Sequence, residues 1–216
     1  MEIILIGKSD PGYPASLTRF LPSNAPDGAA AIGNLEILTR SKVAIFCSAM
    51  CPETLKSGAY ELIQMLDAGG VTAIGGFHSP IERGCLEILL NGAQPIIISP
   101  ARSLDKLRIR PEYRAPLQQG RLLFLSFFKH HRHRSDVEMA FRRNCIVAAL
   151  ADLILILHAA PGSNTERLCQ ELSSWQKAVY TIDHPANRNL LRSGVQALPL
   201  DRLRALIIDY CRRNET

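Results

Sequence analysis

Short apolar runs rich in β-branched residues alternate with helix-length amphipathic segments through most of this chain. The runs at 42–47, 95–99 and 152–157 are apolar nearly throughout. Strands of a parallel sheet are buried on both faces, so they lack the apolar and polar alternation of a half-exposed strand. The pattern therefore predicts an α/β fold, a doubly wound and mostly parallel sheet with helices on both faces. The expected strands lie at 42–47, 71–76, 95–99, 122–126, 152–157 and 178–182, and the expected helices at 53–70, 79–93, 111–118, 135–150, 164–177 and 199–216.

The chain is long enough for one such domain with a small addition at each end. Its 216 residues, 47% of them hydrophobic, supply a single sizeable core. Residues 1–40 are rich in proline and glycine, which predicts an N-terminal cap packed on the core rather than an independent fold. We therefore expect a cap at 1–40, the α/β domain at 41–198 and a terminal helix at 199–216 packed on that domain.

Basic residues concentrate in the middle of the chain. The net charge of +5 and the pI near 9.0 favour anionic partners only weakly. The distribution is more informative, because basic residues crowd between 102 and 143. We expect these residues to form one basic face.

The apolar runs and the cysteines indicate where the protein resides. No stretch approaches the roughly 18 consecutive apolar residues of a membrane span, and the first residues lack the basic flank and cleavage site of a secretory signal. We therefore expect a cytoplasmic protein without a membrane partner. The six cysteines stand in apolar surroundings, which predicts buried, reduced thiols. The spacing of Cys47 and Cys51 matches neither a CxxC redox motif nor half of a zinc site.

Two predicted loops have the small residues that an anion site needs. In open α/β sheets, ligands bind beyond the carboxyl ends of the strands, where loops and helix N-termini offer backbone N–H groups. Glycine and serine at such junctions also serve the turn alone, so both interpretations stay open. The residues concerned are Gly75 and Gly76 in one loop, and Gly162, Ser163, Asn164 and Thr165 at the start of a helix in the other.

Arg142, Arg143 and Asn144 lie on the predicted helix that leads into the strand at 152–157. Adjacent helical residues point about 100° apart, so we expect one arginine to face the site and the other to face away. A solvated helix face is the alternative for both arginines. Asparagine is disfavoured inside a helix, which suggests a hydrogen-bonding role for Asn144.

The run "KHHRHR", from Lys129 to Arg134, allows three interpretations. It is a solvated loop, a phosphate-binding loop in which Lys129, Arg132 and Arg134 contact the ligand, or a metal site. The neighbouring arginines support the second interpretation, as do Phe127 and Phe128, whose rings can stack on bases. The run itself contains no carboxylate or thiolate beside its histidines, so no metal is expected.

The sequence offers little for catalysis. The absence of GxGxxG and GxxxxGK[ST] disfavours a dinucleotide dehydrogenase and a P-loop NTPase. GxSxG and HExxH are absent as well. His158 and His184 are the histidines at predicted strand ends, and the simpler interpretation of each is a polar loop residue. We therefore expect no catalytic residue and no cofactor.

Several short stretches match the motifs of a known family in order and spacing over most of residues 12–194. The stretches are GYPASL, AIGNLEIL, GGFHSPIERGCLEILLNGA, RRNCIVAALADLILIL, GSNT and NLLRSG. On these residues the chain resembles the DNA-processing protein A family, also called Smf. Arg143 and Asn144 stand at the family's Arg-Asn, and Glu82 stands at an aspartate. Cys47, Ser48 and the following alanine replace the family's Gly-Ser-Arg, so the resemblance is to a diverged member.

The resemblance implies a Rossmann-like domain, related to lysine-decarboxylase-like phosphoribohydrolases, that binds single-stranded DNA. It also implies a RecA-type recombinase as a partner in transformation or repair. In this interpretation Arg143 and the run from Lys129 to Arg134 contact phosphates. The terminal helix either closes the core or mediates a homodimer.

The alternative is a nucleotide-binding protein or a phosphoribohydrolase. The stretches MAFRRN and PGSNTE have a slight similarity to phosphoribohydrolase motifs. Such an enzyme cleaves a nucleoside monophosphate between base and ribose. A sensor of a nucleotide-derived ligand is the third interpretation.

Overall fold

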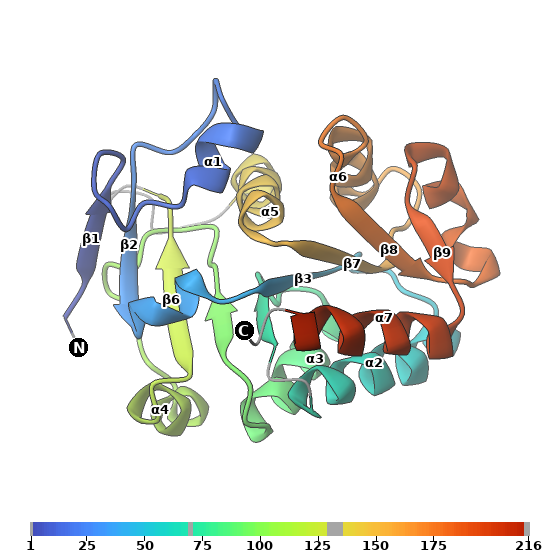
Figure 1. Ribbon diagram of the computed structural model, residues 1–216, viewed down its shortest axis with the longest axis horizontal. Helices are drawn as coiled ribbons and strands as arrows, with labels where there is room; N and C mark the ends of the chain where they lie inside the picture. The colour runs from blue at the N-terminus through green and yellow to red at the C-terminus, as the bar shows by residue number, and fades with distance from the viewer. Residues whose placement is uncertain (1, 69–70, 129–135, 214–216) are drawn as a thin grey trace.

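The computed structural model describes residues 2–68, 71–128 and 136–213, and these form a nine-stranded sheet between two layers of helices (Figure 1). The strands lie in the order β1-β2-β6-β5-β4-β3-β7-β8-β9. Their bounds are β1 Ile4–Gly7, β2 Gly28–Gly33, β3 Lys42–Cys47, β4 Thr72–Gly75, β5 Ile96–Ile98, β6 Leu122–Ser126, β7 Leu153–His158, β8 Ala178–Ile182 and β9 Gln196–Leu198.

Helices cover both faces of the sheet (Figure 1). One layer contains α2 (Lys56–Ala68), α3 (Pro80–Asn91), α4 (Pro111–Gln118) and α7 (Leu200–Arg213), and the other contains α1 (Ala15–Phe20), α5 (Val137–Leu150) and α6 (Asn164–Leu172). The 3-10 helices are η1 (Leu35–Thr39), η2 (Glu53–Leu55) and η3 (Pro185–Ser193). Among the described segments, no helix is both long enough and apolar enough to cross a membrane.

The predicted fold class is confirmed. The seven neighbouring strands from β6 to β9 pair in parallel. Strands β3, β6 and β7 are buried along their whole length, as their continuous apolar runs predict. The start of α3 follows a sequence signal, because Ser79, directly before Pro80, caps the helix. Ser163 caps α6 in the same way.

The order of the parallel strands reverses between β3 and β7. From β3 the chain winds outward through β4, β5 and β6, and then returns to β7 on the other side of β3. Such a topological switch point leaves a crevice beyond the carboxyl ends of the two strands, where ligands bind. Cys47 pairs with His158 at that edge, so the loops that follow these two residues border the crevice.

Residues 1–40 extend the sheet. β1 pairs antiparallel with β2, and β2 pairs antiparallel with β6. The helix α1 packs on α5, and the terminal helix α7 packs on α2. Because the sheet continues from β2 into the parallel strands, the division at 1–40, 41–198 and 199–216 stays a prediction.

The core has one half on each face of the sheet. In β3, Val43 and Ile45 belong to the half beneath α2 and α3, whereas Ala44 and Phe46 belong to the half beneath α5. Full burial of a valine or isoleucine side chain contributes about 1.5–3 kcal/mol. A slip by one residue would exchange the two sets of side chains, so the packing of both faces fixes the register of the sheet.

Gly33, at the end of β2, provides a test of this register. Its φ is +117°, and a Cβ built there lies 2.2 Å from the carbonyl oxygen of Leu122. Gly33→Ala is expected to lower the free energy of unfolding by about 2–4 kcal/mol, because backbone strain adds to a clash with the sheet. Gly12→Ala is the control, since nothing lies within 4 Å of its Cβ position. Equal free energies of unfolding in urea for the two variants would contradict the pairing of β2 with β6.

Candidate functional site

Polar contacts join the strand ends across the switch point. We call the edge of the sheet from Ser99, after β5, to Ser163, before α6, the carboxyl edge. Ser48 Oγ donates to Ser163 Oγ at 2.9 Å and accepts from the Ala160 N–H at 2.9 Å. The Ser48 N–H donates to the carbonyl of His158 at 2.9 Å. The loops after β3 and β7 are therefore held together at this edge.

Glu82, in the first turn of α3, joins the ends of β3 and β4. Its Oε1 accepts from the Cys47 N–H at 2.9 Å, and its Oε2 accepts from the N–H groups of His78 at 2.7 Å and Ser79 at 3.2 Å. Ser79 Oγ accepts in return from the Glu82 N–H at 3.2 Å, which completes a capping box. These bonds hold the loop in which Phe77 adopts a left-handed φ of 53°, a strained conformation for a bulky residue.

Arg143 packs against Gly76 beneath the same edge. Its guanidinium donates to the carbonyl of Ser99 at 2.9 Å and to Asn144 Oδ1 at 2.8 Å. A Cβ at Gly76 would lie 1.4 Å from Arg143 Nη1, so the arginine packs there only because the residue is glycine. Burial lowers the pKa of Arg143 to about 10, while the negative charge of Glu82 favours its charged form. Because Arg143 is 4% exposed, it lies inside the protein and holds the edge in place through these contacts.

The N-terminus of α6 lies on the other side of the switch point. Gly162 has a φ of +73°, and its N–H donates to Glu166 Oε2 at 2.7 Å. Ser163 Oγ accepts from the Glu166 N–H at 3.2 Å. Asn164 and Thr165 follow as the first residues of α6, and Thr165 is buried. The chain's own carboxylate and hydroxyl thus bind the N–H groups that a phosphate would use at Gly162 and Glu166.

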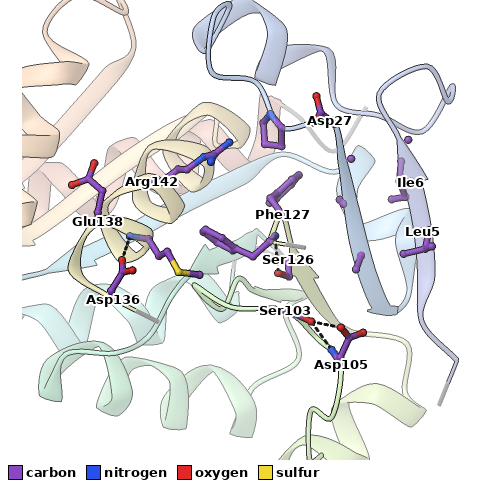
Figure 2. Close-up of a pocket in the computed structure, with 17 residues that line it drawn as sticks. Leu5, Ile6, Asp27, Ser103, Asp105, Ser126, Phe127, Asp136, Glu138 and Arg142 are labelled. Atoms are coloured by element: carbon purple, nitrogen blue, oxygen red, sulfur yellow. Dashed lines mark hydrogen bonds between the residues drawn. The ribbon is translucent and has the colours of Figure 1, made fainter. Parts of the chain in front are cut away.

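Lys129, Arg132 and Arg134 lie outside the described residues. The described chain on either side of them borders a cavity of about 660 Å³ (Figure 2). Its charged lining among the described residues is Asp27, Asp105, Asp136, Glu138 and Arg142. Because carboxylates outnumber the arginine, these described walls disfavour a phosphate.

Phe127 and Arg142 line this cavity (Figure 2), and Phe128 lines it as well. Phe127 is buried in the half of the core that contains Phe141 of α5, so little of its ring is open to a base. Phe128 is half-buried. Arg142 is exposed whereas Arg143 is buried, and this opposite orientation agrees with the helical geometry expected from the sequence.

A groove of about 700 Å³ lies between α3 and α4 and reaches the carboxyl edge at Gly76 and His78. We call it the α3–α4 groove. Its charged and ionisable walls, apart from His78, are Arg83, Glu87, Arg102, Arg108, Arg110, Glu112, Tyr113 and Arg121. This lining is strongly basic.

Part of this positive charge is compensated within the protein. Arg110 pairs with Glu112 at 3.7 Å, and Arg121 donates to the carbonyl of Leu89 at 3.2 Å. The remaining lining arginines are exposed and form no ion pair with any residue in the described part of the chain; they are Arg83, Arg102 and Arg108. The groove is therefore suited to an anionic ligand.

His78 lies where the groove meets the carboxyl edge. Partial burial and the positive charges of Arg143, Arg102 and Arg83 lower the pKa of His78 to about 4. The ring is therefore neutral at pH 7. A bound anion would offset the repulsion and raise this pKa.

The sequence reasoning did not identify His78 or Arg83. In the loop after β4 the glycines are the recognisable sequence feature, and Arg83 lies outside the basic stretch at 102–143. Helical spacing was the available signal, since Arg83 and Glu87 stand one turn apart and thus share a face of α3. His158 and His184 have structural roles, because His158 lies 2.8 Å from Asn187 Oδ1 and His184 caps η3.

The fold and the site together define a Rossmann-like domain whose basic groove opens at the carboxyl edge of the sheet, an arrangement suited to a phosphate-bearing ligand. The sequence profile described as DNA recombination-mediator protein A matches residues 4–199. The chain belongs to this family, which confirms the resemblance. No curated protein matches the sequence.

Solved structures share this fold. DNA processing protein A from Streptococcus pneumoniae has a TM-score of 0.77 at 18% identity, covering 95% of this chain and 74% of that one. The protein of the same name from Helicobacter pylori has a TM-score of 0.77 at 18% identity, and the match covers 99% of this chain and 98% of that one. A molybdenum cofactor binding protein from Rippkaea orientalis has a TM-score of 0.57 at 13% identity, and the match covers 79% of this chain and 97% of that one. At these identities the likenesses establish the fold alone.

Glu82→Gln tests the contacts that hold the carboxyl edge. The amide keeps the shape of the side chain but loses the charge and one acceptor oxygen, so we expect the free energy of unfolding to fall by about 2 kcal/mol. Glu87→Gln is the control, because Glu87 is exposed on the same helix and its replacement should cost less than about 0.5 kcal/mol. Thermal and urea unfolding measure the free energy of unfolding of both variants. Similar losses in the two variants would refute the role given to Glu82.

Proposed function

We propose that the protein binds single-stranded DNA along the α3–α4 groove and the carboxyl edge, and that it assists recombination or DNA uptake. The observation that carries this proposal is the set Arg83, Arg102 and Arg108, which are exposed and have no ion-pair partner among the described residues. Family membership supports it. The relative from Helicobacter pylori is itself described as having a unique single-stranded DNA binding mode.

The groove offers a single strand both charge and aromatic surface. Arginine guanidinium groups bind phosphate oxygens in a bidentate manner, and Arg83, Arg102 and Arg108 would do so in this groove. Bases would stack on the exposed ring of His78 and on half-buried Tyr113, whose ring packs edge-on against Phe124 at 5.3 Å. Contacts of this kind bind with weak sequence preference and strong salt dependence.

The residues singled out from the sequence have distinct roles in this proposal. Gly75 and Gly76 contribute by lacking side chains, because the space beside Gly76 holds the Arg143 guanidinium that organises the edge the DNA would contact. Arg143 and Asn144 hold the edge in place from below. Outside the groove, the proposed direct phosphate contacts are Lys129, Arg132 and Arg134. At the far side of the switch point they are Gly162, Ser163, Asn164 and Thr165, where a phosphate would have to displace the Glu166 carboxylate from the Gly162 N–H.

A RecA-type recombinase as partner and a cytoplasmic location are further proposals, and family membership is their support. A homodimer is proposed as well. The apolar face of α7 gives it no support, because Leu203 and Ile207 are buried in the core and α7 packs on α2.

The phosphoribohydrolase alternative requires a glutamate whose carboxylate is free to contact a nucleotide. Glu166 instead accepts from Asn189 Nδ2 at 2.6 Å and from the Gly162 N–H, and these bonds lower its pKa. Glu171 is exposed on α6. Because the described geometry does not favour hydrolysis, single-stranded DNA binding is our conclusion.

The triple variant with Arg83, Arg102 and Arg108 changed to alanine tests the groove. We expect it to bind a labelled oligo-dT roughly tenfold to a hundredfold more weakly at low salt. The slope of log affinity against log salt should also fall by about 2, because each phosphate contact on a single strand contributes about 0.7. Fluorescence anisotropy over a range of salt concentrations measures both quantities.

A second triple variant separates the groove from overall charge. Arg40, Arg192 and Arg202 are exposed and do not line the groove, so their replacement by alanine removes the same charge elsewhere. Equal weakening in the two triple variants would refute the groove as the binding surface. A wild-type protein that does not bind the oligonucleotide at low salt would refute the proposed function.

The pKa of His78 provides an independent test. NMR titration of the free protein should give a value near 4, and Arg102→Ala should raise it because one nearby positive charge is lost. Saturating oligo-dT should also raise it, since bound phosphates stabilise the protonated ring. Arg40→Ala is the control and should leave the value unchanged. A His78 pKa that does not respond to bound DNA would place the DNA away from this end of the groove.

A further inference from the structure

The strand β1 forms one end of the sheet, and its outer edge pairs with no further strand of the described chain (Figure 1). Two large hydrophobic side chains of this strand are exposed, Leu5 by 64% and Ile4 by 39%. Open strand edges tend to pair with other chains, and proteins often protect them with lysine, proline or a bulge. The strand Ile4–Gly7 has none of these, and its pairing with β2 runs without interruption. This edge is therefore suited to accept another strand.

The hydrogen bonds of β2 determine which backbone groups of β1 face outward. On one side of β2, the Asn34 N–H donates to the Leu122 carbonyl at 3.5 Å, so the even-numbered residues of β2 bond β6. On the other side, the Lys8 N–H donates to the Asp27 carbonyl at 2.9 Å, so the odd-numbered residues of β2 bond the even-numbered residues of β1. Because bonding alternates along an antiparallel ladder, the odd-numbered residues of β1 direct their N–H and carbonyl groups away from the sheet.

Part of this outer edge is already occupied. The Gly7 N–H donates to Asp10 Oδ2 at 2.7 Å, and the Gly7 carbonyl accepts from the Asp10 N–H at 3.0 Å. Leu5 and Ile3, which directly precedes the strand, continue the outward pattern. No hydrogen bond joins their N–H or carbonyl groups to any residue that the structure describes. Each of these two residues therefore offers one open donor and one open acceptor.

We propose that this edge pairs with β1 of a second copy of the chain, antiparallel and about a two-fold axis, so that two sheets join into one. In the register that uses the open groups, Ile3 of each copy lies opposite Leu5 of the other, and each such pair exchanges two N–H···O bonds. The two Ile4 side chains then face each other on the axis. This pairing rests on the homodimer proposed above, gives it an interface, and does not depend on DNA binding.

A second copy fits this edge because the edge complements itself. Ile3, Ile4 and Leu5 are apolar, so the side chains of this segment meet apolar partners. Glu2 and Lys8 flank the segment, are exposed, and lie on the same face of the strand as Ile4. Glu2 of each copy becomes a diagonal neighbour of Lys8 of the other, a distance that long side chains span. The two-fold axis generates this contact between opposite charges twice.

The neighbouring registers are disfavoured. A shift of two residues places Leu5 opposite Leu5 and Ile3 opposite Gly7, so Gly7 would have to give up both of its bonds to Asp10. A shift of one residue places the open groups opposite groups that are already bonded to β2. The free backbone groups thus select one register.

Charge at Ile4 tests the interface. Ile4 is exposed in the single chain, so Ile4→Lys and Ile4→Glu should fold like the wild type. The paired segment is short and buries less than the roughly 1,200–2,000 Å² of a stable complex, so the wild-type dimer should dissociate on dilution, which sedimentation velocity measures. Each variant alone places like charges opposite each other and should raise the dissociation constant at least about tenfold. An equimolar mixture of the two places opposite charges on the axis and should restore the dimer.

Leu191→Lys is the matched control, because it places the same charge on another exposed hydrophobic residue, in η3. It should dimerise like the wild type. A wild type that stays monomeric at its highest soluble concentration would refute the homodimer together with this interface. A dimer that survives either charge at Ile4, or a mixture that does not associate, would refute this interface alone. None of these measurements contains DNA, so DNA binding is judged separately.

The register is tested with Ile4→Cys. Opposite residues of an antiparallel pair that are not hydrogen-bonded have Cα atoms about 4.5 Å apart, a distance that a disulfide bridges. Mild oxidation should therefore link two copies through position 4, which non-reducing electrophoresis and peptide mapping detect. Leu5→Cys is the control, because the two copies of position 5 lie on opposite sides of the axis and should link at least about tenfold more slowly. Equal or faster linkage in Leu5→Cys would overturn the proposed pairing.

Discussion

The carboxylate of Glu82 is the contact on which the carboxyl edge depends. It accepts backbone N–H groups from the end of β3 and from the loop after β4, and it is 7% exposed, so water does little to weaken these bonds. The carboxylate fixes the start of α3, the left-handed Phe77 and the loop that carries His78. Its charge also favours the charged form of buried Arg143, which holds the end of β5. Two buried charges thus set the spacing of three strand ends.

The basic groove follows from this arrangement. α3 begins at the carboxyl edge, and Arg121 binds carbonyls at its far end, so the helix lies fixed along the sheet beside α4. Arg83 comes from the first turns of α3, while Arg102 and Arg108 come from the connection between β5 and α4. Carboxylates outnumber arginine in the described lining of the cavity near β1 and β2 (Figure 2), whereas arginines outnumber glutamates in the groove. The described linings of the two hollows thus differ in the sign of their net charge, and the groove has the positive charge that an anionic strand requires.

The sequence predicted the parallel part of the fold because its strands, such as Ile96–Ile98 and Leu153–His158, are buried on both faces and have unbroken apolar runs. It did not predict β1 and β2 as strands, because the alanines and glycines of Gly28–Gly33 give no such pattern and their pairing with β6 is a tertiary effect. Capping residues such as Ser79 are recognisable from local chemistry, because a serine directly precedes Pro80 at the start of the helix. The packing of Arg143 on Gly76 is not recognisable in this way, because it joins residues from different elements.

The central claim is that single-stranded DNA lies in the α3–α4 groove where it meets the carboxyl edge. Photo-cross-linking of an oligonucleotide that contains 5-bromodeoxyuridine, followed by peptide mapping, tests the claim directly because it locates the bases. The account predicts cross-links at His78 and Tyr113, the accessible rings of that groove. Cross-links confined to α1, α6 or α7, with none on peptides that line the groove, would contradict it.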